Sequence, residues 1–129
     1  MKKNISDRYV RLWPRDLLHI EDQQSALKDK LTWPGIYILY RGSVPYYVGK
    51  AHNVYRRLCD HSNIDTRYGN LWDMFSAFAV SDPDARNDVE AILIQAMPTA
   101  NGSRPHPFKR IRLPKKMQDA FFEHKNLGG

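Results

Sequence analysis

The sequence predicts an α/β (α+β) fold, a small sandwich in which a three-stranded, mainly antiparallel sheet is flanked by helices. A β-branched and aromatic run at 36–40 is followed closely by a second short run at 46–48, which is typical of a hairpin. Helix-start signals then precede residues 54–61 and 83–97, and a third apolar stretch lies between them. The length of 129 residues suits one domain.

A helix, two strands and a turn are predicted within the first 48 residues. Residues 1–31 form an N-terminal extension that ends in a polar, helix-compatible segment at 21–31. The Trp-Pro-Gly sequence at 33–35 breaks this helix, and the strand 36–40 follows. Residues 41–43 (Arg-Gly-Ser) supply the turn to the second strand, which makes the two strands a hairpin.

The middle of the chain is predicted to alternate between helix and strand. Asn53 is a good N-cap for a helix in which Val54, Leu58 and His61 share one face. After a loop at 62–70, residues 71–80 supply the third strand in their second half.

The last predicted helices follow this strand. Asp82 and Pro83 have the residue types of an N-cap and a first helical position, so a helix runs from there to about Met97. A Pro- and Gly-rich loop at 98–114 precedes a terminal helix at 117–124. The prediction divides the single domain into the extension, a core at 32–101 and a C-terminal segment at 102–129.

The composition excludes several classes of protein. Hydrophobic residues make up 42% and charged residues 26%, which is ordinary for a globular protein and argues against disorder. No run approaches the roughly 20 apolar residues of a membrane helix, and no apolar segment of a secretory signal follows the N-terminus. The single cysteine, Cys59, excludes an internal disulfide and a cysteine-rich zinc site. A cytoplasmic location without membrane contact is therefore expected.

The positive charge is concentrated in one segment. The chain has 20 Lys and Arg against 14 Asp and Glu, a net charge of +6. The segment 102–116 has no acidic residue, so a polyanion such as nucleic acid is the expected partner, although a solvated basic loop has the same composition. The basic residues of the segment, all predicted to bind nucleic acid, are Arg104, Lys109, Arg110, Arg112, Lys115 and Lys116.

Glu90 has an unusual place in the predicted helix 83–97. The helical period puts it at the edge of a broad apolar arc, so its carboxylate is partly buried or faces a cleft. It either pairs with an arginine or holds a divalent cation. The arc consists of Ala85, Val89, Ile92, Leu93, Ala96 and Met97.

Two further pairs of side chains are candidates for a site. Arg57 and His61 lie four residues apart and share a helix face, so they either make ordinary surface and helix-end interactions or converge on a phosphate. Tyr37 and Tyr47 would lie directly opposite each other if the hairpin loop is odd in length. They are either a packing pair or part of the same site.

Gly35-Ile36-Tyr37 followed by Tyr47-Val48-Gly49 resembles the motif pair that defines the GIY-YIG nucleases, with Val in place of Ile in the second motif. The resemblance covers residues 33–102 and is strongest to the N-terminal nuclease domain of the bacterial excision-repair incision subunit. It implies a GIY-YIG-type sandwich and a catalytic set of Tyr37, Tyr47, Lys50, Arg57, His61, Glu90 and Asn101. Lys50 matches a lysine that only some members have.

The resemblance implies a divalent-metal-dependent endonuclease that hydrolyses phosphodiester bonds in DNA. Glu90 would bind the metal, Mg²⁺ or alternatively Mn²⁺, and Arg57 would hold a phosphate oxygen. Either Tyr37 or His61 would be the general base, and a tyrosine could act so only if its pKa were lowered strongly. The alternatives are a catalytically weak nucleic-acid-binding or interaction module, or a ribonuclease. A protein partner or a homodimer would supply specificity, since a long sequence-reading module is absent.

Overall fold

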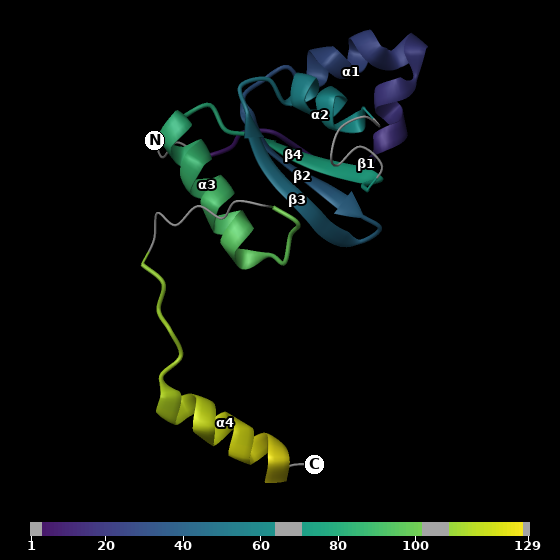
Figure 1. Ribbon diagram of the computed structural model, residues 1–129. Coiled ribbons are helices and arrows are strands. Elements are labelled where there is room, and N and C mark those ends of the chain that lie inside the picture. Colours follow the sequence, from purple (N-terminus) through teal and green to yellow (C-terminus); the bar gives the residue numbers. More distant parts are fainter. Residues whose placement is uncertain (1–3, 64–70, 102–108, 128–129) are drawn as a thin grey trace.

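Four strands form one antiparallel sheet in the order β1-β4-β2-β3 (Figure 1). The computed structural model describes residues 4–63, 71–101 and 109–127. The hairpin of β2 and β3 occupies one side of the sheet, so β3 is an edge strand and β1 is the opposite edge. The strands are β1 (Tyr9–Pro14), β2 (Gly35–Arg41), β3 (Val44–Ala51) and β4 (Met74–Ala79).

The predicted count of three strands is wrong, because the N-terminal region supplies a fourth. Strand β1 pairs with β4, the neighbour that the predicted sheet would have left uncovered. The pairing of β1 with β4 is interrupted by a register shift between Val10 and Trp13, and Leu12 has a positive φ of 54°. The backbone N–H of Leu12 donates to the Ser76 hydroxyl instead of a strand partner (2.9 Å). These irregularities explain why the sequence of β1 does not read as a regular strand.

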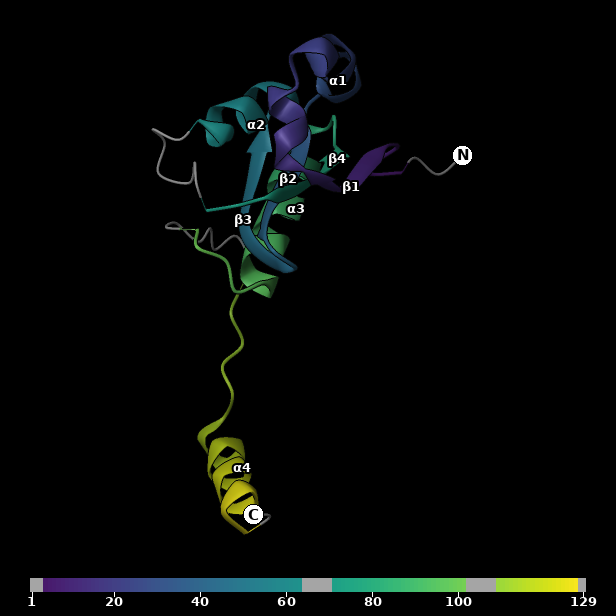
Figure 2. The same cartoon turned by 90° about the vertical axis from the view of Figure 1, so that its right-hand side faces the viewer.

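Helices cover both faces of the sheet. Helices α1 (Gln24–Leu31) and α2 (Val54–Ser62) pack on one face, and α3 (Pro83–Ala96) packs on the other (Figures 1 and 2). The central strand β2 is therefore buried on both sides, which accounts for its unbroken apolar sequence. Its odd-numbered residues Tyr37 and Leu39 join the core under α1 and α2, and Ile36 and Ile38 join the core under α3.

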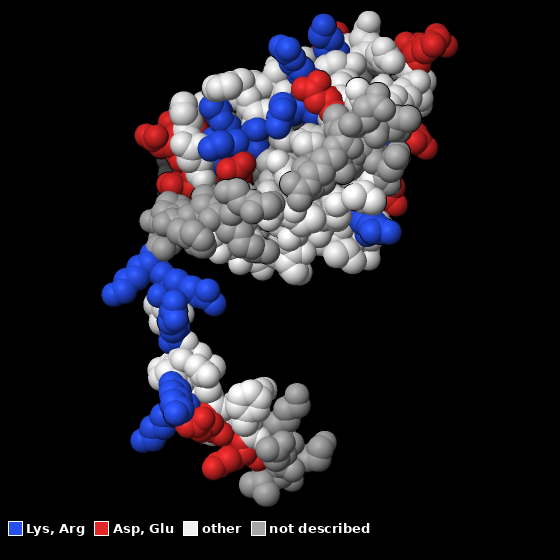
Figure 3. Space-filling view, in the orientation of Figure 1, with Lys and Arg blue, Asp and Glu red and all other residues white. Residues whose placement is uncertain are grey.

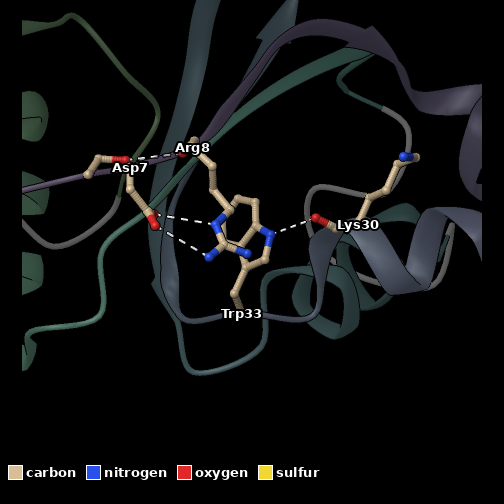
Figure 4. Close-up of polar contacts among 5 residues, drawn as sticks. Asp7, Arg8, Lys30 and Trp33 are labelled. Carbon is tan, nitrogen blue, oxygen red and sulfur yellow. Dashed lines mark hydrogen bonds and ion pairs between the residues drawn. The ribbon is translucent and has the colours of Figure 1, made fainter.

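The approach to β2 is fixed by a tryptophan. The short 3-10 turns η1 (Arg15–His19) and η2 (Glu21–Gln23) lead into α1, and Trp33 follows it. Trp33 donates its indole N–H to the Lys30 carbonyl at the end of α1, at 2.6 Å (Figure 4). Figure 4 also shows the ion pair of Asp7 and Arg8, which precedes β1. The Trp-Pro-Gly break predicted from the sequence thus turns the chain from α1 into the sheet.

Helix α3 begins as predicted, but it buries a different face. The Asp82 side chain accepts from the backbone N–H of Ala85, which makes it the N-cap. The buried residues of the helix are Arg86, Ala91 and Ile94, and Ile92 is 53% exposed. The predicted apolar arc was therefore wrong about Ile92 and Ala96, which are both exposed. Glu90 nevertheless lies at the margin of the buried face, as expected.

The C-terminal helix α4 (Lys115–Leu127) is longer than the predicted 117–124 and stands away from the sandwich in both ribbon views (Figures 1 and 2). Met117, Phe121 and Phe122 on it are exposed. In the part of the chain that the structure describes, no helix is long and apolar enough to cross a membrane. The predicted division of the chain at residues 31 and 101 stays a prediction, although β1 and α1 both pack with the core.

Candidate active site

Two tyrosines and a histidine form a cluster on the α2 side of the sheet. The Tyr37 hydroxyl lies 2.8 Å from His61 Nε2, and the ring centroids of this pair are 5.4 Å apart. The Tyr47 ring lies 6.2 Å from that of Tyr37 and 5.1 Å from that of His61. Tyr37 is fully buried and His61 is only 8% exposed, so the cluster continues the core. The structure thus brings together three residues that the sequence placed on three separate elements.

The hairpin register decides which residues meet in this cluster. Tyr37 pairs with Gly49, and Tyr47 pairs with Leu39, so the two tyrosines are diagonal neighbours. The directly opposite placement required a loop of odd length, and the loop has two residues; the tyrosines nevertheless share a sheet face. A two-residue turn with Gly42 at φ 63° joins the strands, and a register shift between Leu39 and Tyr40 then changes the pairing by one residue.

Gly49 leaves the space that the Tyr37 ring occupies. A Cβ atom at residue 49 would lie 2.2 Å from the hydroxyl oxygen and from Cζ of Tyr37. Gly35 is equally restricted, since a Cβ there would lie 2.1 Å from the Phe78 carbonyl oxygen. The glycines of both tripeptides are therefore required by close approach, and Gly49 sets the position of the Tyr37 hydroxyl directly.

Burial shifts the pKa values of Tyr37 and His61 so that both side chains stay uncharged at neutral pH. Burial, reinforced by the neighbouring Tyr47 hydroxyl, raises the pKa of Tyr37 far above its ordinary value, and Arg57 only partly opposes this. Burial, with a further contribution from the Arg57 charge, lowers the pKa of His61 to about 4. At neutral pH the pair is thus a phenol and an uncharged imidazole. Tyr37 could act directly as a base only if its pKa were lowered, but the protein surroundings raise this pKa.

Arg57 lies on the outer side of the same cluster. Val54, Leu58 and His61 are buried as predicted, whereas Arg57, which the sequence placed on the same face, is exposed. Its positive charge acts on both Tyr37 and His61, lowering the pKa of each. An exposed guanidinium beside a buried phenol can meet an anion that approaches the cluster from solvent.

Glu90 lies on the other face of the sheet, on α3. Its carboxylate Oε1 is 3.7 Å from Lys50 Nζ, and Lys50 also donates to Asn87 Oδ1 at 2.6 Å. The Glu90 side chain is only 15% exposed. Burial raises the pKa of Glu90, and the charge and hydrogen bonds of Lys50 oppose the rise. A half-buried carboxylate held against a lysine at the sheet edge is poised to exchange that partner for another cation.

Asn101 fixes the open edge of β3. Its side chain makes two hydrogen bonds to Val48, accepting from the backbone N–H at 3.1 Å and donating to the carbonyl at 2.8 Å. The N–H of Ala100 donates to the Tyr46 carbonyl at 2.7 Å. The chain after α3 is therefore hydrogen-bonded to β3 at Tyr46 and Val48. Among the described residues, the side-chain hydrogen bonds of Asn101 are both to the Val48 backbone, so they hold the chain after α3 against β3.

The two halves of the site meet across the edge strand β3. Tyr47 points to the α2 side and Lys50 to the α3 side, and Gly49 between them carries no side chain. Figure 3 shows Lys and Arg side chains gathered on the surface between α2 and α3, with acidic side chains among them. The arrangement can therefore receive an anion from solvent, with a proton-carrying pair on one side and a carboxylate on the other.

The basic segment lies apart from this cluster. Arg104 is outside the described residues, whereas Lys109, Arg110 and Arg112 are exposed and lead toward α4, which begins with Lys115 and Lys116. Figure 3 shows basic side chains along this path. The structure does not bring these five residues into contact with the candidate site.

Sequence reasoning missed two residues of α3. Asn87 accepts the hydrogen bond from Lys50, and Arg86 is buried nearby. Asn87 precedes Glu90 by three residues, so helical spacing would have placed it on the same face. In the residues that the structure describes, no group of three or more His, Cys, Asp or Glu could hold a metal ion.

Known proteins resemble this chain over its core. No family model matches it. The UvrABC system protein C of Deinococcus radiodurans is 35% identical over 75 residues, which is 58% of this chain, and the chain spans only 12% of the length of that relative. The GIY-YIG N-terminal endonuclease domain of UvrC from Thermotoga maritima, in a point-mutant form bound to its catalytic divalent cation, superimposes with a TM-score of 0.51. It is 28% identical, and the match covers 63% of this chain and 98% of that one. A second point mutant of the domain matches with the same TM-score at 27% identity.

Proposed function

We propose that this chain, which belongs to the GIY-YIG nuclease superfamily, is a divalent-metal-dependent endonuclease that hydrolyses phosphodiester bonds in DNA. The observation that carries the proposal is the pairing of two chemical functions across β3. The hydrogen-bonded Tyr37 and His61 lie on one side, and the half-buried carboxylate of Glu90 lies on the other. A phosphodiester needs both a proton acceptor for water and a counter-charge for the phosphoryl oxygens.

The residues of this site fit a single hydrated divalent cation. Glu90 offers hard oxygen donors, and its low exposure and its ion pair with Lys50 show that it already faces positive charge. Mg²⁺ usually keeps several waters and takes one or two protein carboxylates, so one glutamate suffices. When bound, Mg²⁺ or Mn²⁺ would polarise the phosphate and stabilise the departing oxygen. Glu90 would hold it, and Lys50 would give up its contact with the carboxylate.

The side chains on the α2 side would bind the phosphate and accept the proton of the attacking water. Arg57 would bind a non-bridging oxygen through its exposed guanidinium. Because His61 is uncharged at neutral pH, its Nε2 can accept the proton of the Tyr37 hydroxyl while Tyr37 takes a proton from the attacking water. Tyr47 would hydrogen-bond the water or the phosphate. This relay uses both residues that the sequence offered as alternative bases.

The test is a cleavage assay of the wild type, Glu90→Gln and Asp88→Asn in Mg²⁺, Mn²⁺ or EDTA. Asp88→Asn is the matched control, because it removes the same charge from an exposed position of the same helix. The substrates are single-stranded, duplex, branched and plasmid DNA, and RNA. We expect metal-dependent cutting of DNA by the wild type and Asp88→Asn, and its loss in Glu90→Gln. Cutting of RNA alone, or tight binding of DNA without cutting, would overturn the proposal in favour of a ribonuclease or a binding module.

The basic segment is proposed to follow the substrate backbone. Its exposed side chains carry positive charge without nearby acids between residues 109 and 116. Charge reversal of Lys109, Arg110 and Arg112 should weaken DNA binding and flatten its dependence on salt. With fewer phosphate contacts, fewer counterions are released from the DNA on binding. Unchanged binding across a salt series would remove this segment from the interface. A protein partner or a second copy of the chain would then have to provide selectivity, in a cytoplasmic setting.

A further inference from the structure

A pocket lies where β3 ends and α3 begins, next to the ion pair of Lys50 and Glu90. It has a volume of about 350 Å³. Three of its lining side chains are basic, namely Lys50, His52 and Arg86, and no acidic residue lines it. Its remaining lining residues are Ala51, Pro83 and Asn87.

Arg86 is the unusual member of this pocket. It is only 5% exposed, and its Nη1 donates to the Val80 carbonyl at 3.0 Å. This is the one side-chain hydrogen bond of Arg86 among the residues that the structure describes, and within that part of the chain it has no ion pair. A guanidinium has five N–H donors, and a buried cation without a counter-charge is costly to the folded state. One carbonyl does not account for placing it there.

The acids near the pocket are directed elsewhere. The Asp82 carboxylate caps α3 through the N–H of Ala85, and Asp84 and Asp88 are exposed. The Glu90 carboxylate does not line the pocket, and Lys50 contacts it from the pocket margin. The pocket therefore combines a buried guanidinium, an ammonium and an imidazole with room for one anion.

The spacing relates this pocket to the proposed metal site. Arg86 and Glu90 are four residues apart on α3, about 6 Å along the helix axis and on the same face. Successive nucleotides rise about 3.4 Å along one strand of a duplex. A phosphate at Arg86 would therefore lie within one or two nucleotides of a phosphate at Glu90.

We propose that the pocket of Lys50, His52 and Arg86 binds a backbone phosphate next to the scissile one and so sets the register of the substrate strand. This rests on the proposed nuclease function. Arg86 would bind the phosphate oxygens through the donors that Val80 leaves free, and Lys50 would connect the two phosphates from between them. The cost of burying Arg86 is then offset in the complex with nucleic acid.

The test measures binding without cleavage. In a Glu90→Gln background with EDTA, duplex DNA binding is followed across a salt series for Arg86→Met, Arg86→Lys and Arg11→Met. Arg11 is exposed on β1, the edge opposite β3, so Arg11→Met loses an equal charge away from the pocket. We expect the slope of log K against log salt to fall by about 0.9 for Arg86→Met, as for one lost phosphate contact, and to be kept by Arg86→Lys and Arg11→Met. Equal slopes for Arg86→Met and Arg11→Met would overturn the proposal.

A second variant guards against misfolding of Arg86→Met. His52→Asp places a negative charge in the pocket from an exposed position, and His19→Asp adds the same charge on η1. Inorganic phosphate should raise the unfolding temperature of the wild type and of His19→Asp, and raise it less in His52→Asp. No difference between the two variants would count against the pocket. Wild-type cleavage in Mg²⁺ tests the nuclease function separately, so a failure of the pocket proposal can be told apart from a failure of the nuclease function.

Discussion

Acid should destabilise this protein through His61, before most carboxylates titrate. The imidazole is buried, its Nε2 is 2.8 Å from the Tyr37 hydroxyl, and its backbone carbonyl accepts from the indole of Trp72 at 3.1 Å. Protonation would place a charge in this buried cluster beside Arg57, and Asp60 offsets it only in part. The folded state therefore resists protonation, and the pKa of His61 falls to about 4 from its ordinary value of 6.5.

The sign and size of the effect follow from these two values. Between pH 6.5 and 4 the unfolded chain binds a proton at His61 that the folded chain does not, so the free energy of unfolding rises with pH. The contribution is complete above pH 6.5 and is lost as the pH falls to 4. The difference of 2.5 between 6.5 and 4, at about 1.36 kcal/mol per pKa unit, corresponds to about 3 kcal/mol. Glu90 acts in the opposite direction, because its pKa is raised on folding.

Urea unfolding of the wild type and His61→Gln at several pH values between 4 and 7.5 measures this contribution. Glutamine can accept from Tyr37 but does not titrate, and the contribution of Glu90 is common to both proteins. The difference between the two free energies of unfolding should therefore shrink by about 3 kcal/mol on acidification. NMR titration of the His61 ring carbon should give its pKa directly. Parallel curves for the two proteins, or a His61 pKa near 6.5, would refute the argument.

Two further predictions concern the neighbours of this cluster. Gly49→Ala should destabilise the fold by about 1–3 kcal/mol in urea, because the new Cβ overlaps the Tyr37 ring, and it should reduce cleavage more than an Ala substitution at exposed Ser43; wild-type stability would contradict the assigned contact. Lys50→Met should raise the pKa of Glu90 further, since Lys50 opposes the rise caused by burial, so metal-dependent activity should reach half its maximum at higher pH; a pH profile that does not move would show that Lys50 has no such influence.

Much of the core could be predicted from the sequence because its signals are local. The Trp-Pro-Gly break, the Asn53 and Asp82 caps and the apolar run of β2 each depend on neighbouring residues, and each is found where expected. The inward face of α2 with Val54, Leu58 and His61 was also correct. Tyr37, Tyr47 and His61 also form one cluster, but the hairpin register, which strand and helix periods do not give, decides how the two tyrosines meet.

The errors arose where distant contacts override the local pattern. Strand β1 is irregular and exists because β4 offers an unpaired edge, a fact that its own residues do not carry. The exposure of Ile92 and the burial of Arg86 reverse what their polarities suggest, because the sheet covers only part of α3. A wheel drawn from hydrophobicity assigns a buried arginine to solvent. The burial of that arginine is also what draws attention to the pocket beside Glu90.

The hairpin shows how the register affects an argument about a site. Had Tyr37 and Tyr47 been directly opposite, they would have been immediate cross-strand neighbours, and Gly49 would not lie across from Tyr37. The register shift after Leu39 instead places Gly49 across from Tyr37. The absent side chain then lets the Tyr37 hydroxyl reach His61, while Tyr47 covers the pair from one side. On the edge strand β3, Gly49 has no side chain to separate the two faces of the sheet. Lys50 directly follows Gly49 and contacts Glu90 on the α3 side. The second tripeptide therefore acts through its glycine as much as through its tyrosine, by joining the proton-carrying side of the site to the carboxylate side.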